Sequence, residues 1–154
     1  HFPQRVAVDF FGRELTYARL GELVDRVASG LQQAGFAPGD RFGLCLPNTP
    51  YSVILYFAVL RAGGVVVNIN PLYTAHELEF LVLDSGAQMV AVPDLEALHG
   101  KVADVWGKGG LRHIVLCPMA DVLPFGKALG LRTLKRKLLA RRRPGVAYLD
   151  YRRL

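Results

Sequence analysis

The chain is poor in the residue types from which metal and redox sites are built. Its 154 residues include two cysteines, four histidines and one tryptophan. Cys45 and Cys117 each lie inside an apolar run and share no CxxC spacing, which predicts two reduced, buried thiols in a cytoplasmic protein. The histidines fall in different predicted elements: His1, His76, His99 and His113. They show neither HxxH nor HExxH spacing, so we predict no metal site.

Loops that would hold nucleotide phosphates are also missing from the sequence. Gly63-Gly64 and residues 107–110 both precede predicted strands, so neither presents the N-terminal amides of a helix to a phosphate. The serines and threonines are never adjacent to one another, and no G-x-S-x-G turn occurs. We therefore predict no catalytic, no cofactor-binding and no metal-binding residue in this chain.

No uninterrupted apolar run is long enough to cross a bilayer. Residues 51–69 come closest, but Arg61 and Gly63-Gly64 divide them, and the part before Arg61 is shorter than the roughly 20 residues that a span requires. This pattern predicts a buried helix followed by a buried strand. The chain starts at His1 without a signal peptide and ends at Leu154 without a stop signal, so we expect a piece cut from a longer protein.

Positive charge is concentrated at one end of the chain. The net charge is +6 and the pI is near 9.6. Residues 1–120 hold 9 Lys/Arg against 11 Asp/Glu, whereas residues 121–154 hold 10 against 2. The first part is therefore close to neutral, and we expect any electrostatic partner to bind the C-terminal part.

The basic segment 121–143 mixes leucines with lysines and arginines. It predicts a helix of about 13 residues that ends before Pro144, with Leu131, Leu134 and Leu138 on one arc. Three interpretations stay open: contact with an anionic membrane surface, a solvated connector whose leucines dock on the body, and contact with nucleic-acid phosphates. The segment lacks the aromatic residues on which single-strand binders stack bases, so nucleic acid is the least favoured.

The rest of the sequence alternates between strand and helix patterns. A hairpin is expected at 6–16, strands at 41–46, 65–67, 88–92, 112–117 and 146–149, and helices at 16–35, 50–62, 74–84 and 94–106. The helix at 50–62 is apolar nearly all round and is expected to be buried. Strands spaced by about 25 residues predict a parallel α/β sheet with flanking helices.

Local signals mark where the helices begin and end. Thr16 is placed to cap the first helix, and Gly35 follows its last residues in the position where a positive φ costs least. Thr74 and Glu77 form a predicted capping box, in which each side chain bonds the backbone N–H of the other. Asp94 is predicted to cap the helix at 94–106.

Several strings in the sequence carry a resemblance to a known family. They are Gly12 to Tyr17 (GRELTY), Leu46 to Pro50 (LPNTP), Leu60 to Thr74 (LRAGGVVVNINPLYT), Glu77-Leu78, and Asp84 to Ala87. In this order and spacing they resemble the N-terminal region of AMP-forming acyl-CoA synthetases. The NPLYT wording is most similar to bacterial long-chain fatty-acid–CoA ligases.

The resemblance implies both a fold and an activity. Residues 1–118 would form the α/β N-terminal subdomain of the adenylate-forming enzyme fold, and residues 119–154 a basic amphipathic segment and connector that stops before the phosphate loop. The implied parent enzyme converts ATP, a fatty acid and CoA into acyl-CoA, AMP and diphosphate through an acyl-adenylate, with ATP, magnesium and CoA as its cofactors. No catalytic residue is carried over onto this chain, which is expected to be inactive alone.

The resemblance also leaves alternatives open. One is a ligase of the same superfamily that acts on short-chain or aromatic acids, and another is a non-catalytic basic α/β module that binds nucleic acid. A homodimer and a cytoplasmic location, peripheral on the inner face of the membrane through residues 121–143, are further expectations. Asn68 and Asn70 either fix the loop that follows them by side-chain hydrogen bonds or line a substrate route.

Overall fold

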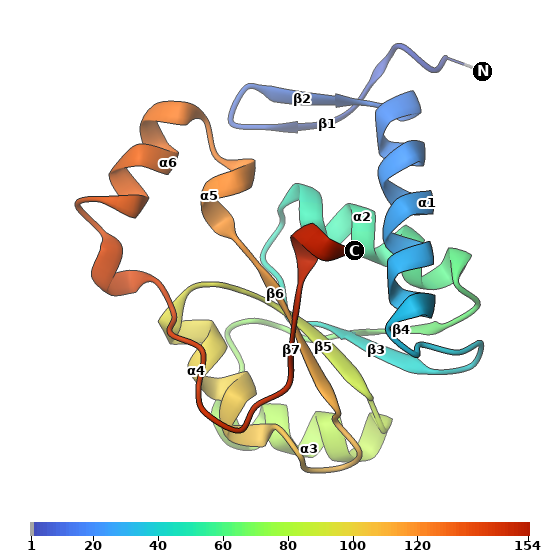
Figure 1. Cartoon of the computed structure of the whole chain (residues 1–154), viewed down its shortest axis with the longest axis vertical. Coiled ribbons are helices and arrows are strands. Elements are labelled where there is room, and N and C mark those ends of the chain that lie inside the picture. The colour runs from blue at the N-terminus through green and yellow to red at the C-terminus, as the bar shows by residue number, and fades with distance from the viewer. Residues whose placement is uncertain (1) are drawn as a thin grey trace.

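Five parallel strands form the centre of the molecule (Figure 1). The computed structural model describes residues 2–154, and His1 lies outside the described residues. The strands lie in the order β4, β3, β5, β6, β7, and every neighbouring pair is parallel. Their bounds are β3 (Arg41–Leu44), β4 (Val65–Asn68), β5 (Met89–Pro93), β6 (His113–Cys117) and β7 (Tyr148–Asp150). The predicted parallel α/β sheet is confirmed.

Helices cover both faces of the sheet. One face of the sheet packs against α1 and α2 and forms one apolar cluster with them. The other face packs against α3 and α4 and forms a second apolar cluster. Their bounds are α1 (Tyr17–Gln33), α2 (Pro50–Arg61), α3 (Ala75–Ser85) and α4 (Glu96–Val105). Met89 and Ala91 of β5 belong to the α1 and α2 side, whereas Val90 and Val92 belong to the other. Burial on both faces explains why β5 is apolar throughout.

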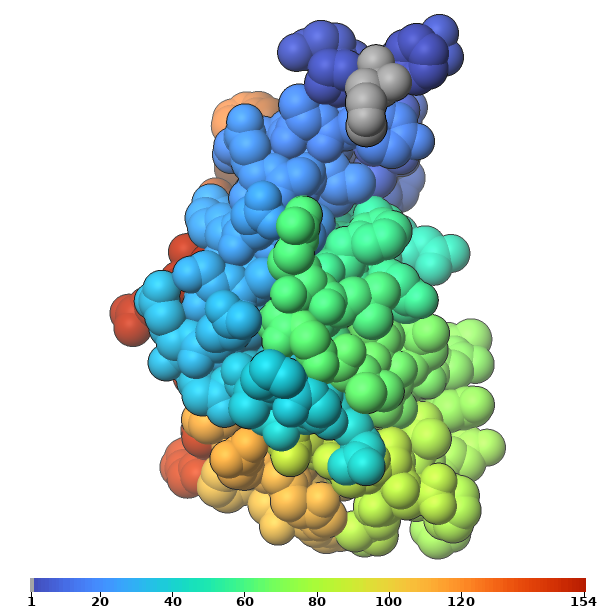
Figure 2. Space-filling view, turned by 90° about the vertical axis from the view of Figure 1, so that its right-hand side faces the viewer, coloured from blue at the N-terminus to red at the C-terminus, as the bar shows by residue number. Residues whose placement is uncertain are grey.

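The remaining elements lie outside this layered centre. An antiparallel hairpin precedes α1, and short helices connect β6 to β7 and follow β7 (Figure 1). Their bounds are β1 (Val6–Phe10), β2 (Arg13–Thr16), α5 (Met119–Val122), α6 (Phe125–Arg132), and the 3-10 turns η1 (Arg136–Leu138) and η2 (Tyr151–Arg153). In the turned view of Figure 2, α1 (blue) runs along α2 and the segment after it (green), and the C-terminal residues (red) lie at the margin.

The predicted hairpin and most of the predicted helix ends are confirmed. The Thr16 hydroxyl accepts a hydrogen bond from the Arg19 N–H at 3.2 Å, and Gly35 has a φ of 86° just after α1. In the capping box, the Thr74 hydroxyl accepts from the Glu77 N–H at 3.3 Å, and a Glu77 carboxylate oxygen accepts from the Thr74 N–H at 2.8 Å. These bonds satisfy donors that the first turn of a helix leaves free.

The predicted capping role of Asp94 is wrong. Leu95 precedes α4, and no side chain caps this helix. The Asp94 carboxylate instead accepts a hydrogen bond from the Met119 N–H at 2.7 Å. The carboxyl ends of neighbouring parallel strands meet at one edge of the sheet, so β5 and β6 bring these two residues together across 25 positions of sequence. Desolvation raises the pKa of Asp94, and this hydrogen bond acts against the rise.

The predicted burial of residues 51–69 is only half right. Leu55 in α2 is fully buried, but Tyr56, Phe57 and Leu60 are exposed, and so is Val65 of β4. β4 is the edge strand and pairs only with β3, so no further layer covers the outer side of α2 and β4. Within residues 2–154, no helix is both long enough and apolar enough to cross a bilayer.

The helix predicted after Gly130 is wrong. α6 begins earlier, directly after Pro124, and ends at Arg132, and η1 follows as a single short turn. The three leucines therefore do not share a face: Leu131 is buried, whereas Leu134 is 90% exposed and Leu138 53%. Leu131 packs against Met119 and Ala120 of α5, and this contact fixes where α6 lies.

Two of the predicted strands have different bounds in the structure. The strand expected at 41–46 ends at Leu44, although Cys45 and Leu46 stay buried. The strand expected at 146–149 is found as β7, which pairs with β6 in parallel. The segment after β6 therefore returns to the same sheet.

Both cysteines are reduced and buried, as predicted. Burial raises the pKa of Cys45 to about 11, and it raises the pKa of Cys117 well above its ordinary value. A thiolate is the reactive form of cysteine, so both groups are unreactive near neutral pH.

A buried histidine of α4 contacts β7, and through it the segment before β7. The His99 side chain has no exposed surface, and its Nε2 lies 2.7 Å from the Tyr148 hydroxyl. That hydroxyl also accepts the Arg143 N–H at 3.1 Å. Burial is the main cause that lowers the pKa of His99 from its ordinary 6.5, and the Glu96 carboxylate, 3.9 Å from Nδ1, acts in the opposite direction.

We expect the chain to lose stability as the pH falls below about 6.5. The unfolded chain protonates His99 at a higher pH than the folded chain does, so acid favours unfolding by at most about 1.4 kcal/mol per pH unit from this group. Urea unfolding at pH 7.5, 6.5 and 5.5 measures the slope. His99→Gln should flatten it. An unchanged slope in His99→Gln would contradict this account.

Candidate functional site

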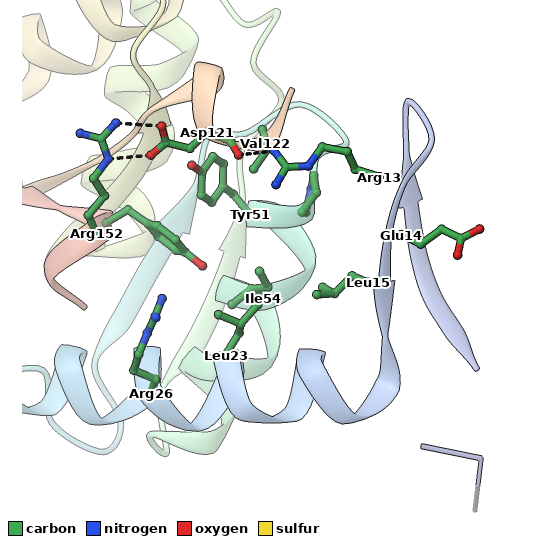
Figure 3. A pocket seen from close by; sticks show the side chains of 12 residues that line it. Arg13, Glu14, Leu15, Leu23, Arg26, Tyr51, Ile54, Asp121, Val122 and Arg152 are labelled. Carbon is green, nitrogen blue, oxygen red and sulfur yellow. Dashed lines mark hydrogen bonds and ion pairs between the residues drawn. The ribbon is translucent and has the colours of Figure 1, made fainter. Parts of the chain in front are cut away.

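A cavity lies between the hairpin, α1, the start of α2, α5 and η2 (Figure 3). Its volume is about 360 Å³. The lining residues come from five separate segments: Arg13, Glu14, Leu15, Leu23, Arg26, Pro50, Tyr51, Ile54, Asp121, Val122, Tyr151 and Arg152. α2 follows β3, α5 follows β6 and η2 follows β7, so the cavity lies at the edge where the parallel strands end, which is where α/β proteins bind ligands.

Asp121 ties three of these segments together. Its carboxylate accepts hydrogen bonds from Arg152 Nε and Nη2 at 2.6 and 2.8 Å, and one from Arg132 Nη2 at 3.1 Å. The Arg13 guanidinium of β2 donates to the carbonyl oxygens of Asp121 and Leu123 at 2.6 and 3.1 Å (Figure 3). The bonds from Arg152 are the main reason that the pKa of Asp121 is lowered. The carboxylate therefore stays charged and holds η2 and α6 against α5.

Two tyrosines form the inner wall of the cavity. The rings of Tyr51 and Tyr151 meet edge to face with centroids 4.4 Å apart. The Tyr51 hydroxyl donates to the Pro118 carbonyl at 2.9 Å, whereas the buried Tyr151 hydroxyl has no partner within residues 2–154. Burial raises the pKa of both tyrosines, so both are neutral phenols, and the positive charge of Arg26 opposes the rise for Tyr151.

The opposite wall of the cavity is apolar. Leu15 of the hairpin, Leu23 of α1 and Ile54 of α2 line it, and Arg26 extends from α1 toward the same space (Figure 3). An apolar wall with a free hydroxyl and with arginine side chains beside it suits a small group that has an apolar body and a polar or anionic end.

A second hollow of about 540 Å³ lies where β3 and β4 end. Three amide side chains, those of Asn48, Asn68 and Asn70, line it together with aromatic residues of α2. The Asn70 side chain accepts a hydrogen bond from the Leu72 N–H at 3.0 Å, so this residue fixes the loop that follows, as one of the two predicted roles requires. Asn68 lines the hollow beside it.

The residues present do not fit a magnesium ion or the phosphates of ATP. Within residues 2–154, no three His, Cys, Asp or Glu side chains are grouped closely enough to hold a metal ion. At the start of α2, the Thr49 N–H donates to the Ser52 hydroxyl at 3.2 Å and Pro50 has no N–H, and at the start of α5 the Met119 N–H is bound by Asp94. We therefore assign no step of a nucleotide reaction to this chain.

Sequence reasoning named no site residue, and the cavity residues were missed. They are brought together only by the fold: Arg13 and Asp121 are 108 positions apart, and Asp121 and Arg152 are 31 apart. Tyr151 and Arg152 lie in the last residues of the chain, where no motif marks them. The only signal in the sequence is that Asp121 is the one acid between Asp104 and Asp150, surrounded by cations.

Comparisons with known proteins agree on one family. A family model described as AMP-binding enzyme matches residues 1–142. The long-chain-fatty-acid–CoA ligase of Bacillus subtilis is 39% identical over 126 residues, which are 82% of this chain and 22% of that protein. The oxalate–CoA ligase of Arabidopsis thaliana is 43% identical over 91 residues, 58% of this chain and 18% of that protein.

A solved structure gives the same result for the fold. The crystal structure of apo MatB from Rhodopseudomonas palustris matches with a TM-score of 0.68 and 29% identity, over 84% of this chain and 26% of that one. The chain spans about a fifth of the length of the curated relatives that it matches.

Proposed function

Because the chain belongs to the family of AMP-binding enzymes, we propose that it forms part of a long-chain fatty-acid–CoA ligase. In the proposed reaction, ATP and a fatty acid give an acyl-adenylate and diphosphate, and the thiol of CoA then takes the acyl group and releases AMP. The observation that carries the proposal is the identity with a long-chain-fatty-acid–CoA ligase over most of this chain.

In this proposal the chain supplies a framework rather than the reacting groups. Both of its thiols are held protonated, and the starts of α2 and α5 are closed by the protein's own hydrogen bonds. ATP, magnesium and CoA would be bound by residues outside this chain. The homodimer and the cytoplasmic location stay predictions from the sequence.

The test is an assay of acyl-CoA formation with palmitate, ATP, magnesium and CoA, followed by mass spectrometry. The polypeptide encoded by the complete open reading frame is expected to form palmitoyl-CoA, and the 154-residue chain alone is expected to give no product above a blank without enzyme. Product from the chain alone would refute the framework role. A complete polypeptide that is inactive with palmitate but active with benzoate or acetate would refute the long-chain assignment.

A dicarboxylic acid is the second candidate substrate. The identity with an oxalate–CoA ligase is 43%, although it covers a shorter part of this chain than the identity with the fatty-acid enzyme. The same assay separates the two candidates, because a dicarboxylate ligase would convert oxalate or malonate and leave palmitate unchanged.

A further inference from the structure

Residues 125–143, named here the basic lobe, form a part of the molecule that stands away from the sheet (Figure 1). The basic lobe comprises α6, η1 and the segment after η1. Its inner side is fixed to the body: Ala128 and Leu131 pack against Met119 and Ala120 of α5, and the Ala140 N–H donates to the Asp94 carbonyl at 2.9 Å. Because the inner side is anchored, the outer side has a defined shape.

Large apolar side chains lie on the exposed surface of the basic lobe. Phe125 is 84% exposed and Leu134 is 90% exposed, and Leu129 and Leu138 are about half-exposed. A solvated connector with docked leucines, one of the interpretations of the sequence, would bury these side chains against the body. Leu131 is docked in that way and Leu139 is partly buried against the same cluster, whereas Phe125, Leu129, Leu134 and Leu138 are available to a partner with an apolar interior.

The charge around these apolar residues is positive and mostly uncompensated. Residues 122–149 contain no Asp or Glu. Three arginines at the margin are paired with acids of the body: Arg132 with Asp121, Arg142 with Asp150, and Arg143 with Asp104. Five other cations have no acidic partner within residues 2–154: Lys127, which lies over the Phe11 ring, and Lys135, Arg136, Lys137 and Arg141.

Three of these cations converge on two hollows, the second of which is also lined by Glu96. One hollow, of about 640 Å³, lies beside Leu134, and the other, of about 420 Å³, lies beside Pro144. Arg136, Lys137 and Arg141 line both of them. Guanidinium and ammonium groups that flank a surface depression bind phosphate oxygens well, because each presents several N–H donors and a full charge.

We propose that the basic lobe docks on a bilayer surface that contains anionic lipids. Phe125 and Leu134 enter the boundary between headgroups and acyl chains, and Lys135, Arg136, Lys137 and Arg141 bind lipid phosphates. Exposed apolar residues beside cations are the combination that such a surface selects. Nucleic acid would use the cations but not the leucines, and Phe125 is the only aromatic residue of the basic lobe on which a base could stack.

The test is co-sedimentation of the 154-residue chain with two kinds of large vesicle. One kind is neutral phosphatidylcholine, and the other is phosphatidylcholine that contains about 30% anionic phosphatidylglycerol. We expect binding to the anionic vesicles only. The triple variant Lys135→Gln, Arg136→Gln, Lys137→Gln should bind about 100-fold more weakly, roughly fivefold for each cation removed. The matched triple Arg5→Gln, Arg61→Gln, Lys108→Gln changes the net charge equally elsewhere and should bind like the parent chain.

Insertion of apolar side chains is tested separately from charge. Phe125→Ser with Leu134→Ser should weaken binding at every salt concentration, whereas Leu72→Ser, which removes another highly exposed apolar residue, should not. In a Phe125→Trp variant, tryptophan fluorescence should shift to the blue with anionic vesicles and stay unchanged with free inorganic phosphate.

Several outcomes would overturn the proposal. These are equal recovery in the supernatant with both kinds of vesicle, equal loss of binding in the two triple variants, tighter binding to duplex DNA or RNA than to the anionic vesicles, and binding that free phosphate abolishes. The polypeptide encoded by the complete open reading frame should bind as the chain does. If only the isolated chain binds, other parts of the polypeptide cover the basic lobe and the proposal fails.

Discussion

Phe42→Ala is expected to lower the free energy of unfolding by about 3–5 kcal/mol. Phe42 lies in β3, the strand between β4 and β5, and its side chain has no exposed surface. It packs in the cluster under α1 and α2, where the Phe36 ring meets it edge to face with centroids 5.8 Å apart. Alanine would leave a cavity that neighbours on a paired strand cannot close.

Urea unfolding followed by far-UV circular dichroism and by the fluorescence of Trp106, the single tryptophan, measures this loss. Phe80→Ala is the matched control, because the same atoms are removed from an exposed side chain of α3, and its effect should stay within about 0.5 kcal/mol. If Phe42→Ala does not fold, Phe42→Leu should fold with a smaller loss. Equal losses at positions 42 and 80 would show that β3 is not in the core.

Gly64→Ala should destabilise the chain by about 1–3 kcal/mol although it adds a single methyl group. A Cβ at Gly64 would lie 2.4 Å from two carbons of the Phe36 ring and 3.1 Å from the Asp40 carbonyl oxygen. The ring is buried and already in contact with Phe42, so it cannot turn away without disturbing the strand beneath it. The backbone at Gly64 does not require a positive φ, so the effect isolates the steric clash.

Gly21→Ala is the matched control for this prediction, and it should have the opposite sign. Gly21 is inside α1, and nothing lies within 4 Å of the place its Cβ would take. Alanine there should stabilise the chain by about 0.5–1 kcal/mol, because glycine loses more backbone freedom in a helix. The same urea titrations give both values. Two changes of the same sign would mean that the packing of Phe36 over Gly64 is not as described.

Helix ends and the alternation of strands and helices were predicted well from local sequence, whereas side-chain partners that are set by distant contacts were not. The cap at Thr16 and the box at Thr74 and Glu77 involve residues three positions apart, so their sequence pattern contains the whole interaction. Asp94 has the same local pattern of a capping residue. Its partner Met119 is set by strand pairing, which no local pattern contains.

The exposure of α2 and the end of α6 show a second reason why the sequence did not predict the structure. An apolar side chain indicates that its burial is favourable, but it does not indicate whether another layer of the structure covers it. The outer side of α2, next to the edge strand β4, was therefore expected to be covered, and it is exposed. The predicted arc of leucines assumed one continuous helix. The anchoring of Leu131 on α5 fixes where α6 lies and leaves Leu134 outside.

The candidate site was the least predictable part. Its cavity is made by Arg13, Tyr51, Asp121 and Arg152, each in a different element, and of these four only Arg13 lies in a string that carries the family resemblance. Family resemblance was carried by turns and helix ends, which maintain the scaffold. A site assembled from single residues of several elements leaves no periodic or spaced signal in a single sequence.

The all-parallel sheet also determines the rate at which this chain folds. Each pairing in it joins strands separated by a helix, and β3 and β5 pair although β4 lies between them in sequence. Every such pairing closes a long loop before its hydrogen bonds form, which makes strand alignment slow compared with local structure. The hairpin and α1 need only near neighbours and form early. Until β3 joins β5, the apolar strands stay accessible to other chains, so folding speed and aggregation compete at the sheet and not at the helices.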